Sequence, residues 1–118
     1  MRDKVCTLLY RLGLTENYTG FFYIMDAVCL AVEEPERLCF VTKLIYPDVA
    51  KKHRTTTAAV ERGIRLGVSR IWRAAPEVLP RMFPVPLRER PTNARFLALL
   101  TAYVREEIFS FYERPGML

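Results

Sequence analysis

The chain has 118 residues, of which 51% are hydrophobic; this is enough for one folded domain with a buried core and excludes an intrinsically disordered chain. No apolar run reaches the roughly 18–20 residues of a membrane-spanning helix, and no signal peptide is recognisable at the N-terminus. The net charge of +5 is concentrated in residues 43–73, which carry eight basic and two acidic side chains. A local basic surface is typical of nucleic-acid sites.

In the N-terminal part, apolar residues at helical spacing predict an amphipathic helix over Asp3–Leu12, ended by Gly13. After a polar connection, the apolar run Phe21–Val32 predicts a central helix buried on nearly all sides, with Asp26 as its only charge. The aromatic residues near its start could form core or a base-stacking platform: Tyr18, Phe21, Phe22 and Tyr23. We favour core, because no basic residue is interleaved with them.

In the middle of the chain, Pro35 and its acidic neighbours predict the start of a third helix over Glu36–Ile45. We expect that helix to bury Leu38, Val41, Leu44 and Ile45. A short fourth helix follows over Pro47–His53, and a fifth helix runs from after Thr55-Thr56 to about Arg73. Residues 47–73 therefore have the outline of a helix-turn-helix, in which the second helix enters the major groove of DNA.

After a break at Ala74–Pro76, Glu77–Met82 is predicted to form one or two helical turns. Phe83–Pro91 contains three prolines and is predicted to be an extended arm. A last helix starts near Thr92, and its tail is expected to fray after Tyr112. We find no convincing strand, so the predicted fold is all-α, a single domain over residues 1–118 with about six helices.

The cysteines and the single histidine suggest no catalytic or metal chemistry. Cys6, Cys29 and Cys39 have neither a disulfide pattern nor zinc spacing, so we expect three small core residues in a reducing cytoplasm. His53 is interpreted as a half-buried packing residue, with titration that modulates DNA affinity as the alternative. Without a Cys–His pairing or a glycine-rich phosphate loop, nothing supports an enzyme, a metal or another cofactor.

A helical wheel divides the fifth helix, residues 57–73, into two faces. The face expected to pack inward consists of Thr57, Val60, Gly63, Ile64, Gly67, Val68 and Ile71. The opposite, polar face contains Ala58, Glu61, Arg62, Arg65, Ser69 and Arg73. Arginine can donate to guanine and glutamate can accept from cytosine. The alternative is an ordinary solvated helix with an ion pair between Glu61 and Arg65.

The residues before the fifth helix suit phosphate contacts. Lys51, Lys52 and Arg54 would lie along the DNA backbone, and the hydroxyls of Thr55 and Thr56 could donate to phosphates beside a helix N-terminus. Ser69, farther along the polar face, is predicted to contact the backbone as well. Ala50 fits a close crossing of the two helices.

The same stretch resembles a known family. The similar segments are Tyr46-Pro-Asp-Val-Ala-Lys-Lys, Thr55-Thr56, Val60-Glu-Arg62, Ile64-Arg65, Trp72, and Pro91-Thr-Asn93 followed by Phe96. Together with a looser similarity over Thr15–Ala31, they resemble the C-terminal effector domain of the sporulation master response regulator, stage-zero sporulation protein A. The resemblance spans roughly Val5 to Arg105 and implies an all-helical domain that binds a short DNA box, often as head-to-tail dimers on tandem repeats.

The resemblance implies base reading by Glu61, Arg62 and Arg65, and backbone contacts by Lys51, Lys52, Thr55 and Thr56. The chain departs from the family pattern at several positions: it shows no phosphoacceptor receiver domain, Ala59 replaces an arginine, His53-Arg54 replaces an apolar-Asn pair, and Gly63 and Gly67 occupy the recognition helix. Because each glycine costs a helix about 0.5–1 kcal/mol relative to alanine, we expect a soft helix that DNA helps to order. A domain that begins at Met1 favours a stand-alone protein.

The sequence therefore predicts a transcription regulator in the cytoplasm, associated with the nucleoid. Its expected partner is double-stranded DNA, bound as a homodimer or in tandem, with RNA polymerase as a further contact. The alternative is a protein-interaction module that kept the fold and lost specific readout. The missing receiver domain, Ala59 and the aromatic tail Phe109–Tyr112 motivate that alternative.

Overall fold

The computed structural model describes residues 1–74, 76–82 and 87–113, with side chains as far as Glu106. In these ranges it contains no strand, seven α-helices and one 3₁₀ helix, so the all-α prediction is confirmed. The elements are α1 (Arg2–Arg11), α2 (Thr19–Glu33), the 3₁₀ helix η1 (Pro35–Phe40), α3 (Val41–Leu44), α4 (Tyr46–Lys52), α5 (Thr57–Ala74), α6 (Val78–Arg81) and α7 (Asn93–Glu113). The described part of the structure has seven α-helices where the sequence predicts about six, because the turns after Glu77 form the separate short helix α6. None of the helices in the described ranges is long and apolar enough to cross a membrane.

Two predictions concern segments that lie partly outside the described residues. The extended arm is non-helical over residues 87–92, and its residues 83–86 lie outside the described ranges. Helix α7 continues through Tyr112 to Glu113, so the expected fraying concerns residues 114–118, which also lie outside them.

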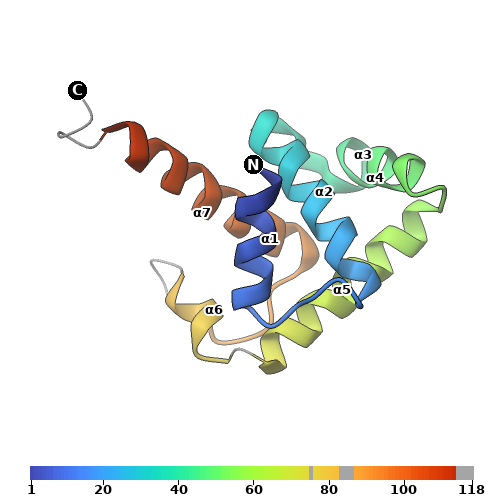
Figure 1. Cartoon of the computed structure of the whole chain (residues 1–118). Helices are drawn as coiled ribbons and strands as arrows, with labels where there is room; N and C mark the ends of the chain where they lie inside the picture. Colours follow the sequence, from blue (N-terminus) through green and yellow to red (C-terminus); the bar gives the residue numbers. More distant parts are fainter. Residues whose placement is uncertain (75, 83–86, 114–118) are drawn as a thin grey trace.

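Helix α2 lies at the centre of the molecule (Figure 1), between α1, α5 and α7. Its sequence is apolar on nearly all sides, with Asp26 as the exception, and this explains its position, because such a helix is stable in water only when it is buried. Phe21 and Tyr23 are buried and Tyr18 packs against the core, which confirms that the aromatic cluster belongs to the core. Phe22 is the exception and remains 39% exposed.

Three glycines bring α2 and α5 into close contact. A Cβ atom on Gly20 would collide with the carbonyl oxygen of Gly63. A Cβ on Gly63 would lie 2.6 Å from Cδ2 of the Tyr23 ring, and one on Gly67 would lie 2.9 Å from Cδ1 of Ile24. The glycines of α5 therefore have a packing function that their helix propensity does not suggest.

The predicted third helix over Glu36–Ile45 is wrong as a single element. The chain forms the 3₁₀ helix η1, then breaks at Phe40, whose φ of −155° and ψ of 74° lie outside the helical region, before α3 begins. A 3₁₀ turn has three residues per turn, so the apolar stripe expected for an α-helix is not maintained. Val41 and Ile45 are buried and Leu38 packs against the core, but Leu44 is exposed.

The expectation of three core cysteines also needs correction. Cys6 and Cys29 are half-buried and pack against the core, whereas Cys39 is exposed. Cys39 belongs to η1, which buries none of its residues completely, and this explains its position.

The close contact of α2 and α5 predicts the effect of Gly63→Ala. Helix propensity alone would stabilise the protein by about 0.5–1 kcal/mol. We expect the opposite sign, a loss of about 1–3 kcal/mol in the free energy of unfolding, because the added methyl group must displace the Tyr23 ring. Urea denaturation measures the change, with Arg73→Ala on the exposed side of α5 as the control. A more stable Gly63→Ala protein would contradict the contact.

Candidate nucleic-acid interface

The α4–α5 pair has the geometry of the predicted helix-turn-helix. Ala50 is buried where the two helices meet, as expected of a small contact residue. The amide of Thr55 donates to the carbonyl oxygen of Ala50 at 2.9 Å and closes the end of α4. Arg54 adopts a φ of 52° in this turn. That conformation is unusual for a side chain other than Gly or Asn, and it leaves Arg54 exposed on the turn.

Thr56 caps the N-terminus of α5. Its Oγ1 accepts a hydrogen bond from the amide of Ala59 at 3.1 Å, so the hydroxyl hydrogen remains to be donated elsewhere. Thr55 is half-buried beside it. Thr57, predicted to pack inward, is exposed, because the buried face of α5 begins one turn later at Val60.

The two faces of α5 are otherwise those that the helical wheel predicts. The buried residues are Val60, Gly63, Ile64, Gly67, Val68 and Ile71. Arg62 and Arg65 are exposed on the other side, and Glu61 and Ser69 are half-buried there. The structure thus places the predicted base-contacting residues on one accessible side of a single helix.

Glu61 and Arg65 form an ion pair with each other. Nη1 of Arg65 lies 2.7 Å from Oε1 of Glu61, and the two side chains are 50% and 41% exposed. An exposed pair at this spacing stabilises a helix by about 0.3–0.5 kcal/mol. The pair therefore contributes little to the stability of α5.

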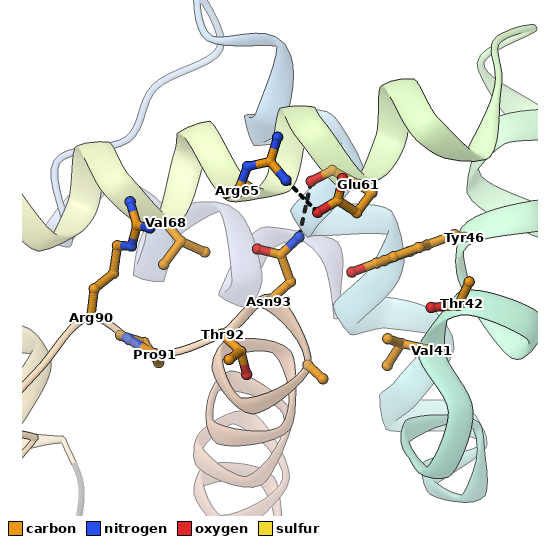
Figure 2. Close-up of a pocket in the computed structure, with 11 residues that line it drawn as sticks. Val41, Thr42, Tyr46, Glu61, Arg65, Val68, Arg90, Pro91, Thr92 and Asn93 are labelled. Atoms are coloured by element: carbon orange, nitrogen blue, oxygen red, sulfur yellow. Dashed lines mark hydrogen bonds and ion pairs between the residues drawn. The ribbon is translucent and has the colours of Figure 1, made fainter.

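Asn93, the first residue of α7, holds α5 in place. Figure 2 shows its side chain reaching α5, where Nδ2 donates to the backbone carbonyl oxygen of Glu61 at 2.9 Å. Asn93 also hydrogen-bonds to Tyr46 at the start of α4; burial raises the pKa of Tyr46, and this bond acts against that effect. In the sequence, Asn93 is identified only as part of the family resemblance, because a contact between residues 93 and 61 leaves no local pattern.

The buried carboxylate of Asp26 binds the end of α4. Nζ of Lys52 lies 2.9 Å from Oδ1, and Nε2 of His53 lies 2.5 Å from Oδ2. Nη1 of Arg2, on α1, lies 2.6 Å from Oδ1. His53 also packs edge-on against the Tyr23 ring, with the ring centroids 5.1 Å apart. The expected half-buried histidine is confirmed, and Lys52 has a protein partner that the sequence did not suggest.

The charge of Asp26 follows from these contacts. Burial would raise the pKa of Asp26, but the hydrogen bonds from Arg2, Lys52 and His53 outweigh burial and hold the pKa below its usual value. A carboxylate with a lower pKa in the folded state stabilises the fold at pH values above its unfolded pKa of about 4. That stabilisation is lost as the pH falls through the folded pKa.

Asp26→Asn tests this arrangement. At pH 7 we expect the free energy of unfolding to fall by about 1–3 kcal/mol, because charge-assisted hydrogen bonds to three side chains are weakened. Below about pH 4 the difference from the unsubstituted protein should shrink, because the unfolded chain then binds a proton at Asp26, and it should be lost as the pH falls through the lower pKa of the folded state. Urea denaturation at both pH values measures this, with exposed Asp3→Asn as the control. An equal difference at both pH values would contradict the role of the charge.

Comparison with known families agrees with this geometry. The family described as "Sporulation initiation factor Spo0A C terminal" matches residues 5–104, a range that includes the α4–α5 pair and Asn93. Members of that family are DNA-binding effector domains rather than enzymes. The chain belongs to the Spo0A C-terminal family, and at the level of that family it is a DNA-binding regulator.

Proposed function

We propose that this protein regulates transcription by binding a short DNA box with α5 in the major groove. The observation that carries the proposal is the exposed polar side of α5, whose opposite side is fixed against α2 by the glycine contacts. A helix held in this way presents the same side chains in every molecule, as sequence readout requires.

Three side chains of α5 are assigned to bases. Arg62 and Arg65 are exposed and long enough to donate two hydrogen bonds to the O6 and N7 of guanine, and Glu61 accepts from the amino group of cytosine. Ala59 offers no hydrogen-bonding side chain where the family typically has arginine. We therefore expect the box of this protein to differ from the family box near that contact.

The turn and the helix ends are assigned to the DNA backbone. Lys51 is exposed at the end of α4, Arg54 is exposed on the turn, and Thr56 keeps its hydroxyl hydrogen for donation. The remaining backbone contacts are assigned to Lys52, Thr55 and Ser69. Lys52 reaches a phosphate only if its ammonium group is shared with Asp26 or released from it.

The wider proposal concerns assembly and place of action. It includes cooperative binding of copies head to tail on tandem boxes, a contact with RNA polymerase, and action in the cytoplasm on the nucleoid. A second candidate function is a protein-interaction module without specific readout. It is favoured by Phe40 and Leu44, large apolar side chains that are 51% and 43% exposed on η1 and α3.

Arg65→Ala and Lys51→Ala separate base reading from phosphate binding. We expect Arg65→Ala to cost about 1–3 kcal/mol of binding free energy on the preferred duplex and to relax the preference at one base pair. Lys51→Ala should weaken binding to all duplexes alike and reduce the dependence of affinity on salt. Titrations of the preferred duplex, its single-base-pair variants and a random duplex measure both effects.

Two results would contradict parts of this proposal. An equal loss on all duplexes for both variants would remove the assignment of Arg65 to a base. If the protein binds no duplex even at low salt, the result would favour the protein-interaction module. Lys51 is a better phosphate probe than Lys52, because replacing Lys52 would also disturb the Asp26 contacts.

A further inference from the structure

The segment before α7 presents arginines from a fixed backbone. Leu87 packs against the core and Pro91 is buried, so both ends of the stretch between them are anchored. Arg88 and Arg90 lie exposed between the anchors, and Arg95 is exposed on the first turn of α7. We call these three side chains the arginine arm.

The arginine arm lies directly beside the recognition helix. Arg90 lines a cleft that it shares with Arg65 and Val68 of α5, and Figure 2 shows its side chain pointing toward α5 beside Val68. Arg88 and Arg95 line the adjoining hollow together with Arg90. The cleft thus brings Arg65 of α5 and a basic segment more than twenty residues farther along the chain to the same part of the surface.

The position of the arm relative to α5 is fixed by hydrogen bonds. The Asn93 side chain bonds to the Glu61 carbonyl on α5 at 2.9 Å, and Oγ1 of Thr92 accepts the amide of Arg95 at 3.2 Å. The Asn93 bond holds the start of α7 against the N-terminal part of α5, and the Thr92 bond caps the first turn of α7. The arm therefore cannot move away from α5 without breaking its attachment.

The charges of the arm are available to a ligand. Within the described part of the chain, Arg88, Arg90 and Arg95 form no ion pair, in contrast to Arg65 on α5. The only acidic residue among residues 87–95 is Glu89, so the segment has a net charge of +2. Three exposed guanidinium groups without an ion-pair partner among the described residues favour an anionic ligand over an apolar one, because they complement its charge.

We propose that the arginine arm is a second DNA contact, which binds phosphates of the backbone that borders the groove occupied by α5. This inference rests on the proposed function, because it takes the place of α5 in the major groove as given. The major groove is about 12 Å wide and is filled by one helix, so a segment beside that helix meets phosphates and not base edges. The arm adds affinity on every sequence and adds no base preference.

The test uses the full chain and the preferred duplex, a random duplex and a series of salt concentrations. Arg90→Ala is expected to weaken binding severalfold to both duplexes and to reduce the slope of log affinity against log salt by about 0.9, the value for one phosphate contact. Arg90→Lys should retain the slope, because a phosphate accepts a point charge where guanine needs the two-pronged guanidinium group. Arg11→Ala on α1 is the control for loss of one surface charge and should leave the slope unchanged.

Glu89→Gln is expected to strengthen DNA binding, an effect that a misfolded variant could not produce. Removing the negative charge from between Arg88 and Arg90 should tighten binding to both duplexes. If Arg90→Ala leaves the slope unchanged while Arg65→Ala still relaxes one base pair, the arm proposal is overturned and the proposed function stands. A changed base preference in Arg90→Ala would also overturn it. If the unsubstituted protein binds no duplex, the proposed function itself has failed.

Discussion

The contact of one buried carboxylate with an arginine, a lysine and a histidine underlies the arrangement of the whole N-terminal half. Asp26 is 4% exposed on the central helix, and its two oxygens receive Arg2 from α1 and Lys52 and His53 from the end of α4. An isolated buried carboxylate would be costly, so these partners must be in place when α2 is buried. The same contacts fix where α4 ends, and therefore where the turn into α5 begins.

Helix α5 is held by three further constraints. The glycines of α2 and α5 let the two helices touch, and this contact decides which side of α5 is buried. The close packing of α4 at Ala50 sets the start of α5, and Asn93 bonds to the Glu61 carbonyl in its N-terminal part. Four elements, α1, α2, α4 and α7, thus act together on the direction in which Arg62 and Arg65 point. Loss of any one contact would be expected to affect DNA binding without touching DNA directly.

Local periodicity predicted the parts of the fold that depend on local sequence. The amphipathic stripes of α1 and α5 and the apolar run of α2 place those helices within a few residues of their observed ends. The division of α5 into two faces follows from the same periodicity, and the resemblance to the family identified which exposed residues to assign to DNA. The break at Phe40 was missed, because nothing in the apolar spacing of Glu36–Ile45 distinguishes a 3₁₀ helix from an α-helix.

Contacts between distant residues could not be predicted in this way. Asp26 is identifiable from the sequence as a charge in an apolar helix, but its partners lie 24, 26 and 27 positions away. The Asn93–Glu61 bond spans 32 positions. By helix propensity alone, Gly63 and Gly67 predict a weakly stable helix. In the structure they are the positions at which α5 packs closely against Gly20 and Tyr23 of α2. In each of these instances the tertiary neighbour, and not the residue type, determines the role.

The central claim is that α5 reads one DNA sequence through Glu61, Arg62 and Arg65. Selection of bound duplexes from a random pool by the full chain, at moderate salt, tests this claim most directly. The account predicts that one short motif becomes enriched over successive rounds. Retention of duplexes without any common motif would contradict specific readout by α5, and retention of none would contradict DNA binding by this chain.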